Sequence, residues 1–363
     1  VHYPQDSMVR RMKGPAGTKV KVTVKRDGGV IPFEITRGKI PMHSVDAAFM
    51  TSATDGYVRV SKFSRSTYEE FVKAIAGLRA QGMEHLVVDL RDNSGGYFDQ
   101  ALMMSNLFLP KDSLIVFLEG RKRAREDYRA DGRGPYQDLP VSLLINEGSA
   151  SSSEIFAGAL QDNHRATIVG RRSFGKGLVQ EPINFTDGSG IRLTVARFHT
   201  PSGRCIQKPY TEDYAFEVYK RYAGSEMVQK DSMKIENGGI IPDVFVPLDT
   251  TRASDFYIKC NKKASALRFA SHYFDKHHAE LSAIDDYAQL LDYLDRAELD
   301  KQFLQFVKKT DGLVPKKGEW EDSKDYMMTQ IRALVGRYSA LSDNAFYHIY
   351  LSIDETFAAA VKK

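Results

Sequence analysis

Two apolar strands that each run through a turn into a helix constrain the fold of this chain most. Residues 85–90 and 141–146 are apolar on both faces, so each strand must be covered on both sides. The first strand is followed by Gly95-Gly96 and a helix, and the second leads into a helix at 152–160. Further strands at 56–60 and 167–169 continue the alternation. The sequence therefore predicts a layered α/β core.

The segments on either side of this core have a different character. Residues 18–26 alternate apolar and polar side chains, and Asp27-Gly28-Gly29 predicts a hairpin into a strand at 30–35. With a helix at 6–13, these two strands are too few to enclose a core. After about residue 250 glycine nearly vanishes and helical stripes follow one another. We predict three parts, residues 1–40, 41–250 and 251–363, of which the last is α-helical.

Charge and composition exclude several classes of protein. Of the 363 residues, 51 are Lys or Arg and 47 are Asp or Glu, a surplus too small to indicate a nucleic-acid partner. No window approaches 18 consecutive apolar residues, so no membrane span is predicted. The two cysteines, Cys205 and Cys260, are predicted to be unpaired. The common zinc motifs are absent, and Gly177 stands where a phosphate-binding loop needs Ser or Thr, so we expect no metal or cofactor.

Three segments carry residues suited to acyl transfer. In residues 89–96 two glycines after a buried strand could offer backbone N–H groups to an oxyanion. In residues 146–154 Ser151 lies at the start of a helix, where the helix dipole stabilises negative charge. In residues 173–180 Lys176 lies between glycines and apolar residues. We expect it to be partly buried, with a pKa lowered enough for it to serve as a base.

Each segment also has a purely structural explanation when it is taken alone. The glycines fit a tight turn after a strand. Ser151 and Glu154 fit a capping box at a helix start, as do Ser66 and Glu69 earlier in the chain. Lys176 fits an exposed turn.

The order of the three segments along the chain is more specific than any one of them alone. The chain contains three motifs in this order: Asp-Leu-Arg-x-Asn-x-Gly-Gly, Gly-Ser-Ala-Ser-x-Ser-Glu and Phe-Gly-Lys-Gly-x-x-Gln. In this order they resemble the carboxy-terminal processing proteases, also called tail-specific proteases. The resemblance runs from about residue 9 to 247 and includes the segments 14–18, 200–204 and 239–243.

The resemblance implies a role for each matching position. Ser151 would be the nucleophile, Lys176 the general base, and Gln180 the residue that orients the lysine. Glu154 would play a supporting part, and Asp162 matches an acidic position without a settled role. The backbone N–H groups of Gly95 and Ser152 would form the oxyanion hole. The chain departs from the family at Ser94, where a proline is usual, and at Ser152, where an alanine is usual.

The resemblance also implies an architecture. The core would be a crotonase/Clp-protease-like spiral of β-β-α units, and residues 1–40 would be the last part of a PDZ module whose native start lies upstream. The enzyme would be a serine endopeptidase that cleaves extended or unfolded polypeptide near C-termini. It would need no cofactor or metal and would act in the periplasm or cell envelope.

The helical part has no counterpart in this resemblance. One of its stripes, formed by Ile284, Tyr287, Leu291 and Leu294, fits one buried helix face. We expect this part to mediate self-association or partner docking, although the stripe also fits packing within the domain.

Two other functions are compatible with the same residues. A crotonase-type enzyme acting on an acyl thioester would share the backbone oxyanion hole without needing Ser151 or Lys176. A peptide-binding scaffold without catalysis would bind polypeptide without turning it over.

Overall fold

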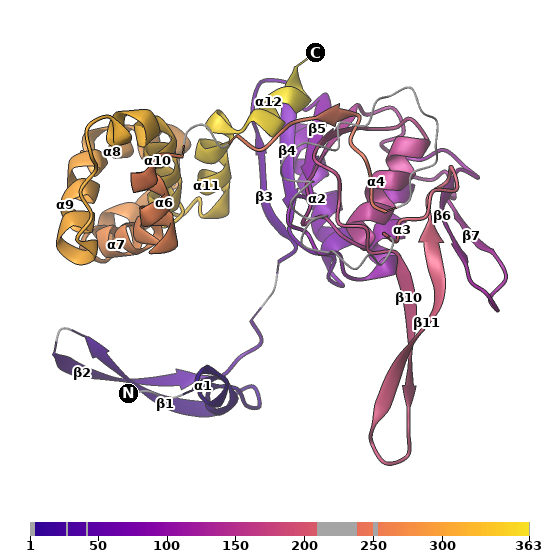
Figure 1. Ribbon diagram of the computed structural model, residues 1–363, viewed down its shortest axis with the longest axis horizontal. Coiled ribbons are helices and arrows are strands. Elements are labelled where there is room, and N and C mark those ends of the chain that lie inside the picture. Colours follow the sequence, from indigo (N-terminus) through magenta and orange to yellow (C-terminus); the bar gives the residue numbers. More distant parts are fainter. Residues whose placement is uncertain (1–3, 27, 41–42, 209–237, 250–252, 363) are drawn as a thin grey trace. The chain divides into compact units, whose positions relative to one another are not determined.

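The computed structural model describes residues 4–26, 28–40, 43–208, 238–249 and 253–362 (Figure 1). The chain divides into two compact units, Val1–His43 and Ser44–Lys363. The first unit ends near the predicted boundary at residue 40. The predicted boundary at residue 250 stays a prediction, and residues 250–252 lie outside the described part.

The N-terminal unit is a helix and a hairpin. Its elements are α1 (Gln5–Met12), β1 (Lys19–Arg26) and β2 (Gly29–Thr36), and the strands pair from Lys19↔Thr36 to Arg26↔Gly29. The Arg37 guanidinium donates to the backbone oxygens of Arg11 and Met12, which ties the helix to the hairpin. The helix and the hairpin are confirmed as predicted, while Asp27 of the turn lies outside the described residues. The unit buries little: Val30 and Phe33 are exposed.

A six-stranded sheet forms the centre of the second unit. Its strand order is β12-β9-β8-β5-β4-β3, with β3 antiparallel at one edge and the other strands parallel. The strands are β3 (Val45–Met50), β4 (Asp55–Val60), β5 (His85–Asp89), β8 (Val141–Ile145), β9 (Thr167–Gly170) and β12 (Val244–Phe245). The predicted α/β core is therefore confirmed, whereas β3 and β12 were not predicted.

Three helices pack on one face of this sheet. They are α2 (Thr67–Ala80), α3 (Phe98–Asn106) and α4 (Ser152–Asp162). Phe71 of α2 and Phe156 of α4 meet edge-to-face with ring centroids 6.3 Å apart. The predicted apolar stripe of α2 is buried as expected. The capping box predicted from Ser66 and Glu69 is wrong, because the Ser66 hydroxyl donates to Glu70, whose carboxylate also accepts the Ser44 and Val45 N–H groups.

The end of the chain covers the opposite face of the sheet. The elements there are α11 (Asp343–Tyr350), η1 (Leu351–Ile353) and α12 (Glu355–Val361). Tyr57 of β4 lies against the rings of Tyr347 and Phe357, at 6.2 and 6.0 Å between centroids. The Asn344 side chain accepts the Ala48 N–H of edge strand β3. These last residues therefore pack against the central sheet (Figure 1).

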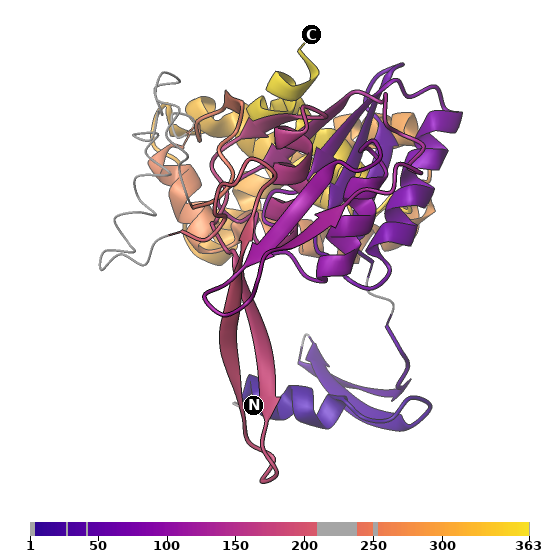
Figure 2. The same cartoon turned by 90° about the vertical axis from the view of Figure 1, so that its right-hand side faces the viewer.

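A second, antiparallel sheet lies beside the core. Its strand order is β10-β11-β6-β7, from β6 (Leu114–Glu119), β7 (Glu126–Arg129), β10 (Leu178–Asn184) and β11 (Gly190–His199). The β10–β11 hairpin extends well away from the body of its unit (Figure 2). Only β11 was predicted, since β6, β7 and β10 lack a clear alternating pattern. The β-β-α spiral stays a prediction.

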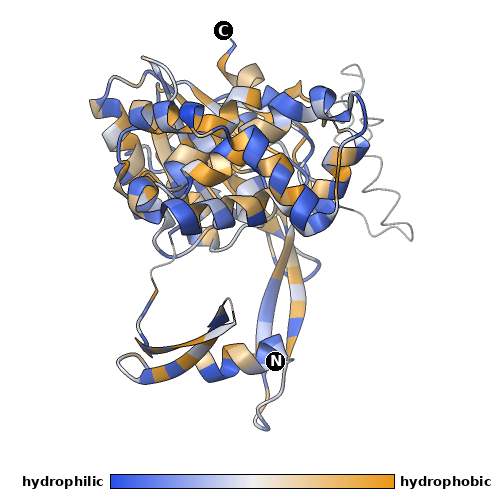
Figure 3. Cartoon of the chain, turned by 90° about the vertical axis from the view of Figure 1, so that its left-hand side faces the viewer, coloured by the Kyte–Doolittle hydropathy of each residue, from blue (hydrophilic) through white to orange (hydrophobic). Residues whose placement is uncertain are grey.

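Five helices form a second apolar core, to which Ala345 and Ile349 of α11 also belong. They are α6 (Asp255–Lys262), α7 (Ser265–Ala283), α8 (Tyr287–Arg296), α9 (Leu299–Asp311) and α10 (Glu319–Gly336). The predicted stripe from Ile284 to Leu294 packs into this core, which is the internal packing that the sequence left open. Hydrophilic and hydrophobic residues alternate along these helices (Figure 3). None of the described helices is long and apolar enough to cross a bilayer. Cys205 and Cys260 are buried, and no disulfide joins them, as predicted.

Candidate active site

Ser151 occupies a strained turn between β8 and α4. It immediately precedes the first residue of α4, and its φ of 57° and ψ of −115° lie in a region that residues with a side chain rarely adopt. The side chain is partly exposed, whereas Ser149, Ser152 and Ser153 are buried. Ser149 donates to Leu90 O, and Ser153 donates to Asn93 O. Of the serines in this turn, Ser151 is therefore the one accessible to a substrate.

Glu154 joins the Ser151 turn to the loop that carries Lys176. Its carboxylate is fully buried. One oxygen, Oε2, accepts the backbone N–H groups of Ser151 at 2.8 Å and Lys176 at 2.9 Å. The other, Oε1, accepts the Ser173 hydroxyl at 2.5 Å and the Gly175 N–H at 2.6 Å. Burial raises the pKa of the Glu154 carboxyl, and these hydrogen bonds offset part of the rise.

Lys176 and Gln180 lie at the surface. The predicted burial of Lys176 is wrong, because the residue is exposed where its loop leaves the core and enters β10. Within the described part of the chain, no hydrogen bond or ion pair joins the Lys176 ammonium to Ser151 or to another side chain. Gln180 is also exposed, and its amide donates to Thr194 Oγ1 at 3.5 Å rather than contacting Lys176. The structure thus brings together the backbones of Ser151 and Lys176 but leaves their side chains apart.

Gly95 packs directly against the serine turn. A Cβ at this position would lie 2.6 Å from Ala150 O and 2.7 Å from Ser151 Cβ, so only glycine fits. Its φ of 94° also favours glycine. The Gly95 N–H donates to the Asn93 side chain at 2.9 Å. By contrast, the Ser152 N–H, at the first position of α4, has no acceptor among the described residues.

Asn93 is a positioning residue that the sequence reasoning missed. It is fully buried, and its side-chain amide donates to Val60 O at 2.8 Å while its Oδ1 accepts the Gly95 N–H. Its backbone oxygen accepts the Ala150 N–H and the Ser153 hydroxyl. Asn93 therefore holds the glycine turn and the serine turn at a fixed distance. Its presence in the Asp-Leu-Arg-x-Asn segment was the available signal.

A buried ionic network lies beneath this turn. The Asp89 carboxylate is fully buried and contacts Arg59 at 2.8 Å and Arg91 at 2.6 Å, and it accepts the Tyr57 hydroxyl. Burial would raise the pKa of Asp89, but the two guanidinium groups outweigh it and hold the pKa well below its usual range. Arg91 also contacts Asp354 at 2.7 Å.

Asp354 connects this network to the end of the chain. Its other oxygen accepts the Phe357 N–H at the start of α12. The strand that leads to Gly95 is therefore anchored to the C-terminal helix. No local sequence signal could reveal this contact, because Arg91 and Asp354 lie far apart along the chain.

Asp162 lies at the opposite end of α4 from Ser151. Its carboxylate pairs with Arg204 and accepts the Ser202 N–H at 2.9 Å. It fastens the segment after β11 to the helix and does not reach the serine turn. Among the described residues, no group of three or more His, Cys, Asp or Glu is placed to hold a metal ion.

The chain is similar to known proteases over this part. Residues 55–216 match the model of peptidase family S41, and residues 256–339 match a family of unknown function. A carboxyl-terminal-processing protease of Synechocystis sp. is 40% identical over 208 residues, which are 56% of this chain and 48% of that protein. A probable CtpA-like serine protease of Staphylococcus epidermidis is 38% identical over 208 residues, 57% of this chain and 42% of that protein.

A solved structure gives a weaker likeness. A photosystem II D1 C-terminal processing protease is 30% identical, with a TM-score of 0.46, and the match covers 64% of this chain and 57% of that one. The chain thus spans about half the length of the curated relatives that it matches. The segment with Ser151, Lys176 and Gly95 falls inside the matched region. Over residues 55–216, which hold the candidate site, the chain is similar to peptidase family S41.

Proposed function

We propose that this chain is a serine endopeptidase that uses Ser151 and Lys176 as a dyad. Its substrates are extended or unfolded polypeptides, cleaved near their C-termini. The Ser151 hydroxyl attacks the peptide carbonyl, and Lys176 accepts its proton and passes it to the leaving amine. Water then hydrolyses the acyl-enzyme. The Gly95 and Ser152 N–H groups bind the oxyanion, and Gln180 orients the amine of Lys176.

The observation that carries this proposal is the shared oxygen of Glu154. Because the Ser151 and Lys176 N–H groups both bond to Oε2, their nitrogen atoms lie within about 6 Å of each other. The long, flexible side chain of Lys176 spans such a separation easily. Rotation of that side chain toward Ser151 therefore completes the dyad without a change in the backbone. A substrate bound over the turn would exclude water from the Lys176 amine. This desolvation would favour the neutral form of the amine, which is the form that can act as a base.

The oxyanion hole requires one further adjustment. In this structure the Gly95 N–H donates to Asn93, so it must turn from that acceptor toward the substrate oxygen. The Ser152 N–H needs no such change. Substrate binding would then assemble both the hole and the dyad, as in other enzymes with catalytic hydrogen bonds that tighten in the complex.

The remaining parts of the chain have proposed roles of their own. Residues 1–40 would be the end of a PDZ module, with α1 as one wall of a peptide groove. The helices after residue 250 would dock a partner or a second copy. The family resemblance supports action in the periplasm or cell envelope.

Turnover of unfolded β-casein by single-residue variants tests this proposal. Ser151→Ala and Lys176→Ala should each abolish cleavage while keeping the circular dichroism spectrum. Lys176→Arg should fail as well, because arginine stays protonated. Ser153→Ala is the matched control, since it removes a hydroxyl from the same turn and should retain cleavage at a cost in stability.

The outcomes separate the alternatives. Full activity in Ser151→Ala would exclude Ser151 as the nucleophile. Binding of casein without cleavage by the native chain would favour a scaffold. Thioesterase activity that survives Ser151→Ala would favour a crotonase-type enzyme.

A further inference from the structure

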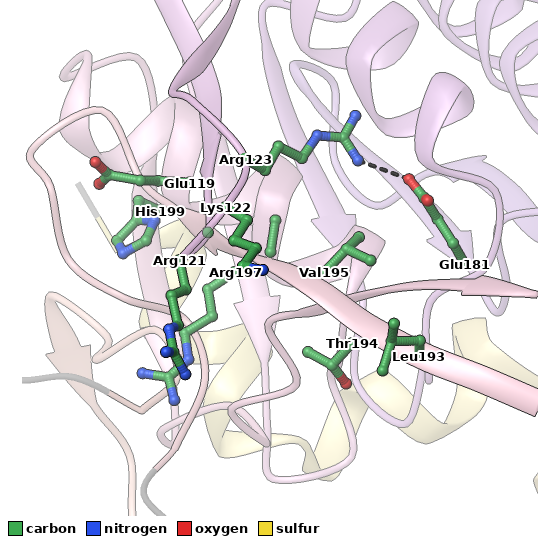
Figure 4. Close-up of a pocket in the computed structure, with 12 residues that line it drawn as sticks. Glu119, Arg121, Lys122, Arg123, Glu181, Leu193, Thr194, Val195, Arg197 and His199 are labelled. Carbon is green, nitrogen blue, oxygen red and sulfur yellow. Dashed lines mark hydrogen bonds and ion pairs between the residues drawn. The ribbon is translucent and has the colours of Figure 1, made fainter.

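A large cavity opens beside the hairpin that follows Lys176. It has a volume of about 1080 Å³ and lies where β11 passes the turn between β6 and β7 (Figure 4). Residues 119–123 form one wall, and residues 193–197 form the other. Gly120 approaches Val195 so closely that a Cβ there would lie 2.1 Å from Val195 O. The turn is thereby fixed against the strand. We call this cavity the basic groove.

Unpaired positive charge lines the basic groove. Arg121, Lys122 and Arg197 are exposed, and none of them has an ion-pair partner within the described part of the chain. Arg123 differs, because it binds Glu181 at 2.8 Å and so neutralises one of the two carboxylates in the lining. The other is Glu119. The groove therefore presents a surplus of cations to whatever enters it.

The same groove contains an open strand edge. β11 pairs with β6 only from Arg197 to His199, and the turn at Gly120 lies against Val195 and Ala196. Residues 191–194 therefore have no strand on that edge among the described residues. An extended peptide can add to such an edge through backbone hydrogen bonds. Ile191 and Leu193 are each half exposed on the same strand and offer apolar contacts. The groove thus combines a backbone template with positive charge.

The register of the sheet relates the groove to the loop that carries Lys176. Leu178, the first residue of β10, pairs with Arg197 of the groove. Lys176 precedes Leu178 by two residues, a spacing of about 7 Å in an extended chain. β10 pairs with the opposite edge of β11, so a polypeptide on the free edge would be separated from β10 by one strand.

We infer that the basic groove binds an extended segment rich in Asp and Glu within the polypeptide substrate. The segment adds to the free edge of β11, and its carboxylates lie against Arg121, Lys122 and Arg197. This inference rests on the proposed endopeptidase function and names the class of substrate that it selects.

Peptide binding to the full chain carrying Ser151→Ala tests the inference without turnover. The probe is a fluorescein-labelled peptide of six Glu-Thr repeats, and the neutral reference is six Gln-Thr repeats. Fluorescence anisotropy should show the acidic peptide binding at least tenfold more tightly at low salt, with the difference shrinking at 0.5 M salt. Equal affinity for the two peptides overturns the inference.

Charge reversal locates the binding site. Exposed charge pairs each change affinity by roughly twofold to fivefold, so Arg121→Glu, Lys122→Glu and Arg197→Glu together should weaken acidic-peptide binding about tenfold or more. The matched control reverses three exposed lysines on the helical part, as Lys276→Glu, Lys316→Glu and Lys317→Glu, with the same change in net charge. It should shift the affinity less than twofold. Equal losses in both triple variants would mean that only net charge matters and would overturn the assignment.

Nucleic acid is the competing ligand for a basic surface. A labelled 12-residue oligothymidylate serves as its probe. If it binds more tightly than the acidic peptide and loses affinity in the groove variant, the groove is a nucleic-acid site and our inference is wrong. The binding measurements test the groove separately from the proposed function. Cleavage by the Ser151→Ala variant would show that Ser151 is not the nucleophile, and it would leave every binding result unchanged.

Discussion

Replacing Glu154 by glutamine tests how the serine turn and the lysine loop are held together. Each carboxylate oxygen accepts two donors, so an NH₂ group in place of one oxygen faces two of them. If the NH₂ replaces Oε1, the Ser173 hydroxyl can turn to accept from it, but the Gly175 N–H is left without a partner. An orphaned buried donor costs about 1–3 kcal/mol. Loss of the charge also weakens the two remaining backbone bonds.

The expected result is a moderate loss of stability and a larger loss of turnover. Relief of the buried charge offsets part of the cost, so we expect Glu154→Gln to lower the free energy of unfolding by about 2–3 kcal/mol. A displaced Lys176 loop should lower kcat on the order of 10²-fold. Urea unfolding followed by circular dichroism and casein cleavage measure the two effects. Asp162→Asn is the matched control on the same helix, and it should lose stability while retaining kcat.

The pH dependence of this effect has a definite sign. Because the pKa of Glu154 is raised in the folded chain above its ordinary value of 4.5, the folded state holds the proton more tightly than the unfolded state. The Glu154 carboxyl therefore costs stability as pH rises from about 4.5 to the folded pKa. Glutamine has no such dependence, so the stability gap between native chain and variant should narrow over that window. The reasoning is refuted if Glu154→Gln keeps kcat within twofold of the native chain, or if Asp162→Asn lowers kcat equally.

Three further predictions follow from the packing of the core. Gly95→Ala should abolish turnover, because the added Cβ would collide with the serine turn. The control is Gly188→Ala, at a similar positive φ but in open space. It should keep activity and lower the free energy of unfolding in urea by only about 1 kcal/mol. Asp89→Asn should lower the free energy of unfolding by about 3–5 kcal/mol at pH 7. Because the pKa of Asp89 is depressed in the folded chain, the difference in stability between the native chain and the variant should persist above pH 4. It should disappear below pH 4, where acid protonates Asp89 in the native chain. Asp354→Ala should remove the Arg91 contact and the cap of α12, and hydrogen exchange should then show faster exchange at 355–361 with little change in α2. Unchanged exchange in that segment would mean that the contact does not anchor the helix.

The sequence predicted the parts of this fold that depend on local pattern. The strands at 85–90 and 141–146 and the stripe of α2 follow from apolar periodicity, and the structure confirms them. Strand β6 was not predicted because it is a short apolar run, buried on both faces, which periodicity cannot tell from a helix segment. Strand β10 was not predicted because it is largely exposed and its side chains do not alternate. Their partners are set by tertiary contacts, which no short window of sequence contains.

The candidate site shows the same division. Ser151 and Gly95 were singled out by the order of three motifs along the chain. The role of Glu154 as a bridge was not predicted, because its four donors come from two separate segments. The burial expected for Lys176 was wrong because neighbouring apolar residues do not fix the direction of a flexible side chain. The Arg91–Asp354 contact depends on the docking of the C-terminal helix onto the sheet.

Trapping the acyl-enzyme tests the central claim most directly. The native chain is mixed with a p-nitrophenyl ester of a short peptide and quenched in acid, and the digested protein is analysed by mass spectrometry. We predict a single acyl adduct on Ser151, formed with a burst of p-nitrophenol and lost in Lys176→Ala. An adduct on another residue, or one that forms at the same rate in Lys176→Ala, would contradict the dyad.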